Sequence, residues 1–386
     1  MSTRPAITVK PKGVGRLRAG HPWVYRSDVE GSAPAGLVRL ADERGQGLGT
    51  ALWSPHSEIR VRWLAPDGET VDAGWWRAKV AAAAARRTGI ADTGHRVVHA
   101  EGDGLPSLVV DRFGDVVVAQ LHTAGLEAER ERVLAAIRDV LAPTGLLLRN
   151  DAPVRERERL PRETAIAFGA VPERAPYTEG QIVLEAAPWS GQKTGAFLDQ
   201  RENHLLLGRL ARGRCLDAFC YHGGFALQLA AGGATAVTAV DSSADALRVL
   251  EAVAARNALT GIRPVEANAF DWLRAAAEGR ERYDVIVVDP PAFARDKASV
   301  RRALGGYKEL NLRAMQLLSA GGHLFTASCS YHVHRGEFFA MLSDAAADSG
   351  RSLQLEAILG AASDHPELLS VPETGYLKAA LLRAVD

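Results

Sequence analysis

Three short segments in the C-terminal half of the chain carry residues that could act together in chemistry. Residues 216–224 read Leu-Asp-Ala-Phe-Cys-Tyr-His-Gly-Gly, residues 289–293 read Asp-Pro-Pro-Ala-Phe, and residues 328–330 read Ser-Cys-Ser. Each follows or ends an apolar stretch that predicts a β-strand, and open α/β sheets bind ligands beyond the carboxyl ends of their strands. We therefore expect a cofactor loop, a carboxylate and a thiol to face one crevice, which favours group transfer with a covalent step.

The first segment is predicted to bind a cofactor that contains a nucleoside. Asp217 ends one predicted strand and Asp241 ends the next, where an acid can bind the two hydroxyls of a ribose. Gly223 precedes a predicted helix and would let a ligand approach the backbone closely. The loop lacks the Gly-x-Gly-x-x-Gly fingerprint of dinucleotide sites, so S-adenosylmethionine (SAM), which has no phosphate, fits better than NAD. Either acid alone could equally cap a helix or form a turn.

Asp289 and Cys329 are the candidate catalytic residues. Two prolines stiffen the turn after Asp289 and hold its carboxylate at the mouth of the predicted crevice, and Phe293 could stack on a flat substrate such as a nucleobase. A rigid turn capped by Asp289 is the simpler interpretation, and it is compatible with catalysis. Cys215 begins a strand and is interpreted as a buried, inert thiol, and Cys220 is expected to pack near the cofactor. Cys329 alone is well placed to attack a substrate.

Composition narrows the classes of protein that the chain can represent. Its 386 residues predict two or three domains. Three cysteines without paired spacing argue against a disulfide framework or structural zinc site, and we expect no bound metal. No apolar run approaches the ~20 residues of a membrane helix, and the first residues lack a secretory core, so we expect a cytoplasmic protein without a membrane partner. The formal net charge is zero, and a cluster of basic residues before Asp28 is most simply a solvated surface.

The pattern along the chain predicts three domains. Residues 1–72 have short apolar pieces punctuated by Gly and Pro, which predicts a small β-rich domain. Residues 73–186 begin with a helix rich in Trp and Ala and predict a small mixed α/β module, in which the alternating charges of residues 155–159 predict a solvated strand or hairpin. Residues 187–386 alternate apolar strands with helices, which predicts a mostly parallel, doubly wound Rossmann-like sheet. The fold class is therefore α/β.

With these motifs in place, the chain resembles the RlmI family of bacterial 23S rRNA cytosine-carbon-5 methyltransferases over essentially its whole length. Residues 20–25 (Gly-His-Pro-Trp-Val-Tyr) resemble the start of the family's N-terminal PUA domain. The other matching motifs are at 191–203, 219–224, 289–293, 328–330, 364–366 (Asp-His-Pro) and 375–378 (Gly-Tyr-Leu-Lys). Each motif is weak alone, but the ordered set is specific. Two positions depart from the family: Asn268, where relatives often carry aspartate, and His222, where a small hydroxyl residue is more usual.

The resemblance implies a PUA-like RNA-binding domain (1–72), a middle RNA-binding domain (73–186) and a class I SAM-dependent methyltransferase domain (187–386). It implies methylation of a cytosine in 23S rRNA, in which Cys329 adds to carbon 6 and Asp289 holds or protonates N3. The expected partner is 23S rRNA or a large-subunit assembly intermediate, and a homodimer is also implied. The predicted cofactor-binding residues are Lys193, Thr194, Gly195, Asp217, Phe219, Cys220, Tyr221, Gly223, Asp241, Asn268, Ala269, Phe270 and Asp289. The predicted substrate-binding residues are Pro290, Pro291, Phe293 and Arg201.

Two other functions stay open on the sequence. Asp-Pro-Pro-x-Phe also resembles a motif of enzymes that methylate the nitrogens of adenine or guanine, and these enzymes need no thiol. Sister families that methylate guanine N7 lack the PUA-like domain. A non-catalytic RNA-binding assembly factor could keep the fold, although the loop, Asp289 and Cys329 together argue against it. A dehydrogenase is least favoured, because the dinucleotide fingerprint is missing.

Overall fold

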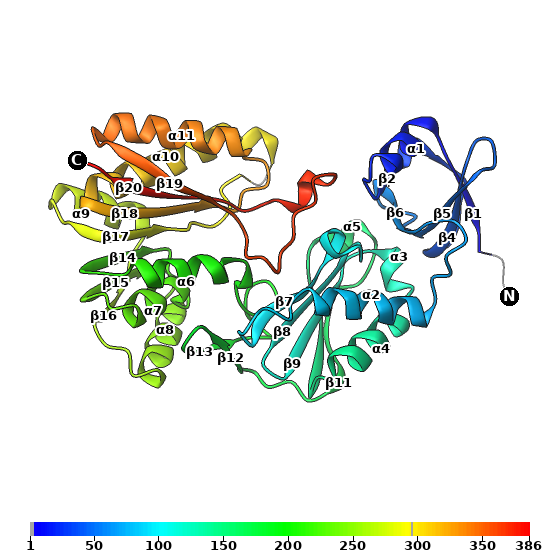
Figure 1. Ribbon diagram of the computed structural model, residues 1–386, viewed down its shortest axis with the longest axis horizontal. Helices are drawn as coiled ribbons and strands as arrows, with labels where there is room; N and C mark the ends of the chain where they lie inside the picture. Colours follow the sequence, from blue (N-terminus) through cyan, green and yellow to red (C-terminus); the bar gives the residue numbers. More distant parts are fainter. Residues whose placement is uncertain (1–3, 295) are drawn as a thin grey trace. The chain divides into compact units, whose positions relative to one another are not determined.

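The computed structural model describes residues 4–294 and 296–386, which form helices and four β-sheets (Figure 1). The first sheet has six strands in the order β2-β6-β5-β4-β1-β3. A short helix, α1 (Pro11–Arg18), lies between β1 and β2 and begins with proline, which is well tolerated in a first helical turn. The sequence pattern did not predict this helix. The strands are β1 (Ala6–Val9), β2 (Trp23–Tyr25), β3 (Val29–Glu30), β4 (Gly36–Asp42), β5 (Gly47–Trp53) and β6 (Ile59–Ala65).

The second sheet has five strands in the order β11-β10-β9-β8-β7 and is covered by two helices that pack against each other, α2 (Ala73–Ala85) and α4 (Arg130–Leu141). Helix α2 begins where the sequence predicts, because the Asp72 carboxylate accepts a hydrogen bond from the Trp75 N–H at 2.9 Å. A short helix, α3 (Ala124–Glu127), precedes α4. The strands are β7 (Gly94–His99), β8 (Leu108–Phe113), β9 (Val116–Leu121), β10 (Gly145–Asn150) and β11 (Glu163–Gly169).

The prediction of a solvated strand or hairpin over residues 155–159 is wrong. These residues lie in or next to a short helix, α5 (Val154–Arg157), and the Arg155 side chain is fully buried. Its guanidinium donates to the Leu121 carbonyl at 2.5 Å and to the Glu127 carboxylate at 2.9 Å. The alternating charges therefore include Arg155, which is buried and paired with Glu127, and the charge pattern alone does not predict such a pair.

The largest sheet has seven strands in the order β16-β15-β14-β17-β18-β20-β19. All neighbours are parallel except the pairs made by β20, which are antiparallel. Since β15 and β17 flank β14 on opposite sides, the strand order reverses at β14, and ligands bind at such a switch point. The strands are β14 (Arg214–Ala218), β15 (Ala236–Asp241), β16 (Ile262–Glu266), β17 (Tyr283–Val288), β18 (Leu318–Ser328), β19 (Leu353–Leu359) and β20 (Lys378–Ala384).

Helices connect these strands and complete the doubly wound α/β arrangement, so the predicted fold class is confirmed. The helices are α6 (Arg201–Leu210), α7 (Gly224–Ala231), α8 (Ala244–Arg256), α9 (Ala269–Glu278), α10 (Val300–Leu317) and α11 (Arg335–Ser349). A two-stranded sheet precedes them, made of β12 (Ala175–Glu179) and β13 (Ile182–Ala186). The short 3-10 helices are η1 (Arg26–Asp28), η2 (Ala100–Asp103), η3 (Leu198–Gln200), η4 (Lys297–Ser299) and η5 (Pro372–Thr374).

Contacts divide the chain into two compact units. Unit 1 comprises Met1–Thr178, Glu185–Leu198 and Asp364–Thr374, and unit 2 comprises Glu179–Leu184, Asp199–Ser363 and Gly375–Asp386. Within unit 1 the first two sheets share one buried cluster, to which β5 gives Leu52, α2 gives Trp76 and β8 gives Val110. The predicted boundaries of three domains stay predictions. None of the helices within the described residues is long and apolar enough to cross a membrane.

Candidate active site

The three segments singled out in the sequence follow neighbouring strands of the seven-stranded sheet. Ala218 at the end of β14 pairs with Val288 at the end of β17, which in turn pairs with Thr326 of β18. The residues that come next therefore leave the same edge of the sheet. The Cys329 Sγ lies 4.0 Å from the Pro290 carbonyl oxygen, so the thiol is next to the turn that begins with Asp289.

Asp217 is a fully buried polar residue at this edge. Its Oδ2 accepts a hydrogen bond from the Ala226 N–H at 2.9 Å, and its Oδ1 has no hydrogen-bond partner among the residues that the structure describes. Burial raises the pKa of Asp217 to about 7, and the carboxylates of Asp289 and Asp241 act in the same direction. A buried oxygen without a partner is costly unless a ligand supplies the missing donor or positive charge.

The loop after β14 has a strained backbone. Phe219 and Tyr221 have φ values of 69° and 48°, which residues with large side chains rarely adopt. Three hydrogen bonds hold this conformation: the N–H groups of Phe219 and Cys220 both donate to the Val240 carbonyl, and the Tyr221 N–H donates to Asp241 Oδ2 at 2.9 Å. Such strain costs of order 1–3 kcal/mol per residue and clusters at ligand sites.

The two glycines of the loop are required by their neighbours in the protein. Gly223 has a φ of 86°, and a Cβ there would lie 2.1 Å from the Leu250 side chain. A Cβ on Gly224 would lie 2.5 Å from the ring of His204, which is itself buried and 2.9 Å from Glu179. Burial opposes a charge on this ring, but nearby carboxylates, Glu179 foremost, raise the pKa of His204. Packing within the protein therefore gives a reason for both glycines besides the predicted approach of a ligand.

Asp241 makes the turn contact that the sequence left open as an alternative, and Asn268 makes a helix-cap contact that the sequence analysis did not consider. Asp241 Oδ1 accepts from the Ser243 N–H at 2.9 Å, in addition to the bond from the cofactor loop. Asn268 Oδ1 accepts from the Phe270 N–H at 2.9 Å and caps helix α9, which begins at Ala269. A carboxylate oxygen can accept more than one hydrogen bond, so Asp241 retains capacity to bind a ribose.

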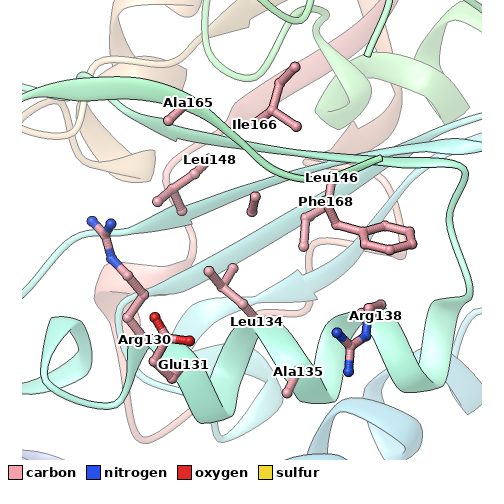
Figure 2. Close-up of a pocket in the computed structure, with 11 residues that line it drawn as sticks. Arg130, Glu131, Leu134, Ala135, Arg138, Leu146, Leu148, Ala165, Ile166 and Phe168 are labelled. Atoms are coloured by element: carbon pink, nitrogen blue, oxygen red, sulfur yellow. The ribbon is translucent and has the colours of Figure 1, made fainter. Parts of the chain in front are cut away.

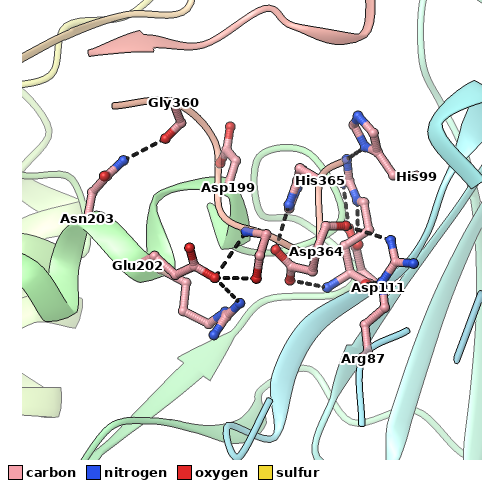
Figure 3. A network of polar contacts seen from close by, with 12 residues as sticks. Arg87, His99, Asp111, Asp199, Glu202, Asn203, Gly360, Asp364 and His365 are labelled. Carbon is pink, nitrogen blue, oxygen red and sulfur yellow. Dashed lines mark hydrogen bonds and ion pairs between the residues drawn. The ribbon is translucent and has the colours of Figure 1, made fainter. Parts of the chain in front are cut away.

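Asp289 is held by a glutamine that the sequence did not point to. Its Oδ2 accepts from Gln200 Nε2 at 3.0 Å, and Gln200 Oε1 accepts from Asn203 Nδ2 at 2.6 Å. Asn203 also donates to the Gly360 carbonyl at 3.0 Å, as Figure 3 shows. The polar density of residues 191–203 was the available signal, but nothing in the sequence linked Gln200 to Asp289.

The three cysteines differ in their surroundings, as the sequence predicted. Cys215 and Cys220 are buried, whereas Cys329 is partly exposed. Burial raises the pKa of Cys215 to about 11 and raises the pKa of Cys220 as well. Both buried thiols are therefore poor nucleophiles, and Cys329 is the accessible one.

Phe293 is part of an aromatic cluster. Its ring centroid lies 4.7 Å from that of Tyr307 and 5.8 Å from that of Phe270, and the ring of Phe219 continues the row. Pro290 and Pro291 precede Phe293 in the sequence. Pro290 is buried and Pro291 is exposed. The predicted contact between Phe293 and a substrate base stays a prediction.

The Lys-Thr-Gly segment belongs to unit 1, whereas the other predicted cofactor residues belong to unit 2. Thr194 Oγ1 donates to Asp111 Oδ2 at 2.5 Å, and Gly195 has a φ of 133°. The segment is further fixed by Arg149, which donates to the carbonyls of Pro188 and Gly191 at 2.6 and 3.1 Å. The Lys193 ammonium lies 4.6 Å from the ring centre of Phe197.

Arg201, predicted to bind substrate, is buried in unit 2. Its guanidinium lies 3.3 Å from Glu202 Oε1, which also accepts from the Ser363 N–H at 3.0 Å (Figure 3). The structure thus shows an intramolecular partner for Arg201, and its contact with RNA stays a prediction.

A pocket of about 280 Å³ lies in unit 1, between α4 and the edge strand β11 (Figure 2). Arg138 stands over the ring of Phe168, with its guanidinium carbon 6.0 Å from the ring centre. The lining residues are Arg130, Glu131, Leu134, Ala135, Arg138, Leu146, Leu148, Ala165, Ile166, Ala167 and Phe168. They include no predicted site residue and no thiol, so this pocket does not carry the chemistry argued above.

Comparisons with known proteins found two matching family models and curated relatives. Residues 7–66 match a model of the PUA-like domain, and residues 182–383, more than half of the chain, match a model of S-adenosylmethionine-dependent methyltransferases. The chain is 36% identical over 378 residues to "Ribosomal RNA large subunit methyltransferase I" of Aeromonas hydrophila subsp. hydrophila, covering 94% of this chain and 95% of that protein. It is 34% identical to the protein of the same name from Pseudoalteromonas atlantica, covering 100% of both chains.

Solved structures share the fold. One from Streptococcus mutans, described as a candidate SAM-dependent methyltransferase, has a TM-score of 0.83 at 21% identity and covers 98% of this chain and 100% of its own. Another, described as a candidate methyltransferase complexed with SAH, has a TM-score of 0.84 at 22% identity over the same shares. The PUA-like domain and the SAM cofactor predicted from the sequence are confirmed. The chain therefore belongs to the family of S-adenosylmethionine-dependent methyltransferases and, within it, to the ribosomal RNA large subunit methyltransferase I family.

Proposed function

We propose that this protein methylates carbon 5 of a cytosine in 23S rRNA, with SAM as methyl donor and Cys329 as nucleophile. The observation that carries the proposal is the partly exposed Cys329 thiol, 4.0 Å from the Pro290 carbonyl in the turn that Asp289 begins. Nitrogen methylation would leave this thiol without a role. The curated relatives, named as large-subunit rRNA methyltransferases, support the choice of RNA.

The residues around Asp217 fit SAM. The cofactor carries positive charge on its sulfur and amino groups, and Asp217 offers a buried oxygen without a partner among the described residues. Asp241 lies at the end of β15, where the hydroxyls of a ribose would find a carboxylate. Bound there, SAM supplies an electrophilic methyl group to the substrate.

The remaining chemistry is assigned to side chains of the protein. The Cys329 thiolate adds to carbon 6 of cytosine, and the electrons of the carbon 5–carbon 6 double bond move into the ring and make carbon 5 nucleophilic. Asp289 holds or protonates N3 as negative charge develops there. After carbon 5 has taken the methyl group, a base removes its proton, the double bond reforms, and the thiolate leaves carbon 6.

The target base has to leave its stack to reach the thiol. The PUA-like domain offers cationic side chains for contact with the RNA: Arg16 lies over the ring of Tyr25 at 4.7 Å, and Arg60 lies over the ring of the buried Trp53 at 5.6 Å. Arginines of this kind bind the RNA backbone and stack on unpaired bases. We expect the substrate to be 23S rRNA or an assembly intermediate of the large subunit, with the protein acting as a homodimer.

The test is to incubate the protein with methyl-labelled SAM and unmodified 23S rRNA, then identify the labelled nucleoside by nuclease digestion and mass spectrometry. Wild type and the matched control Cys215→Ala should give 5-methylcytidine, and Cys329→Ala should give none. If naked rRNA is not labelled, the same assay is run on large-subunit particles from cells that lack the enzyme.

Other outcomes would contradict the proposal. Label on adenosine or guanosine, with full activity of Cys329→Ala, would establish the nitrogen methyltransferase instead. Failure to bind SAM in calorimetry, together with tight binding of rRNA, would favour the non-catalytic assembly factor.

A further inference from the structure

Ser330, the residue after the candidate nucleophile, is hydrogen-bonded to three parts of unit 2. It is fully buried, and its Oγ lies 2.9 Å from the Tyr307 hydroxyl of α10. The same oxygen accepts from the Ala294 N–H at 3.2 Å, in the segment that follows Asp289. The Ser330 carbonyl accepts from Lys378 Nζ at 2.7 Å. The backbone on the C-terminal side of Cys329 is therefore tied to a helix, a loop and a strand.

Lys378 is an unusual residue at this place, because it begins β20 and is only 5% exposed. It pairs in register with Ser328, the residue before Cys329. Its ammonium donates to the Ser330 carbonyl and, at 2.8 Å, to the Tyr376 carbonyl. The ammonium is thus fixed against the backbone of the residue that follows Cys329, and a positive charge close to a thiol favours the thiolate.

We propose that Lys378 and Tyr307 are positioning residues for Cys329. They hold Ser330 by its carbonyl and by its hydroxyl, which fixes the thiol beside the Asp-Pro-Pro turn, and the Lys378 ammonium favours the thiolate over the thiol. The inference rests on the proposed function, in which Cys329 is the nucleophile.

Several titratable groups surround the Ser-Cys-Ser turn. Asp289 at the end of β17 opposes a negative charge on the thiol, and Lys378 of β20 favours one. Tyr307 of α10 stays protonated, since burial raises its pKa and a charge on Cys329 acts in the same direction, against the hydrogen bonds from the neighbouring serines. His332 lies three residues after Cys329 in the connection to α11. Substitution of Lys378 therefore removes the positive charge of this set and leaves the negative charge of Asp289 in place.

The experiment measures the reactivity of Cys329 as a function of pH. Full-length protein without SAM or RNA is treated with iodoacetamide between pH 6 and 10, and mass spectrometry follows each cysteine separately. We expect Lys378→Met to raise the midpoint pH of Cys329 alkylation by about one unit, the lower end of the effect of a nearby opposite charge. Lys378→Arg, which keeps the charge, should bring the midpoint back toward that of wild type.

Tyr307→Phe tests the hydroxyl side of the arrangement. It should leave the alkylation midpoint unchanged, lower kcat for methyl transfer about tenfold, and leave the KM for SAM unchanged, because a small displacement of a catalytic group has such an effect. Buried Cys215 is the internal control, since its alkylation would report unfolding. If Lys378→Met exposes Cys215, Lys378→Gln takes its place.

A midpoint equal to that of wild type in the neutral, folded variant would overturn the role of Lys378. An unchanged kcat in Tyr307→Phe would overturn the role of Tyr307. Alkylation needs neither RNA nor methyl transfer, so the result for Lys378 is independent of whether cytosine is the methylated base.

Discussion

Two buried aspartates, one in each unit, differ in what surrounds their carboxylates, and we propose that the first serves structure and the second binds a ligand. Asp111 of β8 is 1% exposed and Asp217 of β14 is 0% exposed. Asp111 receives both arms of Arg96, at 2.7 and 2.8 Å, and the hydroxyl of Thr194. Burial alone would raise the pKa of Asp111, but the charge and hydrogen bonds of Arg96 hold that pKa below its ordinary value. The carboxylate of Asp111 is thus matched within the protein.

Asp217 has no such match among the residues that the structure describes. A single backbone N–H binds one oxygen, two further carboxylates lie nearby, and the pKa is raised to about 7. The comparison teaches that burial does not distinguish a structural acid from a ligand-binding one. What distinguishes them is whether the protein itself supplies the charge and donors that the carboxylate needs.

We expect the largest effect, a fall in the free energy of unfolding, when Asp111 loses its partner Arg96. Arg96→Met leaves a buried carboxylate without its ion pair, which should lower the free energy of unfolding by about 3–5 kcal/mol. Urea denaturation measures this value, with Arg138→Met as matched control, because Arg138 pairs with Asp139 on the surface and should change stability by less than about 0.5 kcal/mol. Equal losses in the two variants would break the comparison.

The second prediction concerns pH. Asp217 has a raised folded pKa of about 7 against an ordinary value of 3.8, so between these values the native state binds more protons than the unfolded state. Its contribution to the free energy of unfolding should therefore fall as pH rises from about 4 to about 7, by about 1.4 kcal/mol per pH unit at most. The contribution of Asp111 to the free energy of unfolding depends on pH in the opposite direction. It is present above pH 3.8 and is lost as pH falls further.

Urea denaturation of ligand-free protein at pH 5, 6, 7 and 8 checks the effect of Asp217. Asp217→Asn should remove the slope between pH 5 and 7. If the variant and wild type keep parallel profiles, Asp217 is not the group that titrates.

The third prediction concerns affinity for SAM. Asp217→Asn should weaken SAM binding about tenfold, the equivalent of one charge-assisted hydrogen bond, without lowering the free energy of unfolding at pH 8. Isothermal titration calorimetry measures the affinity. Asp284→Asn is the control, because Asp284 lies at the start of β17 and accepts from the Arg214 N–H at 2.9 Å. Loss of stability together with unchanged affinity would make Asp217 a structural residue like Asp111.

The smallest expected effect is at Thr194. Thr194→Val removes the hydroxyl that donates to Asp111 and should lower the free energy of unfolding by about 1 kcal/mol, whereas Thr194→Ser should keep it. The SAM affinity of the same variants, measured by calorimetry, extends the comparison of Asp111 with Asp217. A fall in SAM affinity with Thr194→Val would show that the matched cluster also serves the predicted cofactor segment.

The sequence was sufficient for elements whose pattern is local. Alternating strands and helices from 187 onward predicted the doubly wound sheet, and the strand ends at Asp217, Asp289 and Cys329 were located because apolar runs stop there. Residues joined only through space were not predictable, as Gln200 with Asp289 shows. Helix α5 was missed for the same reason, since the partners of Arg155 lie about 30 residues earlier in the chain.

Because residues 364–374 belong to unit 1, this unit cannot finish folding until nearly the whole chain has been synthesised. Asp364 accepts from the Arg96 N–H at 2.8 Å, and its carbonyl accepts from Arg87 at 2.8 Å (Figure 3). Ribosomes add about 5–20 residues per second, so a nascent chain waits on the order of ten seconds or more between the emergence of Arg96 and that of Asp364. The N-terminal half cannot complete its buried polar network during that interval. Fragments that end before residue 364 should consequently be poor starting points for studying unit 1 in isolation.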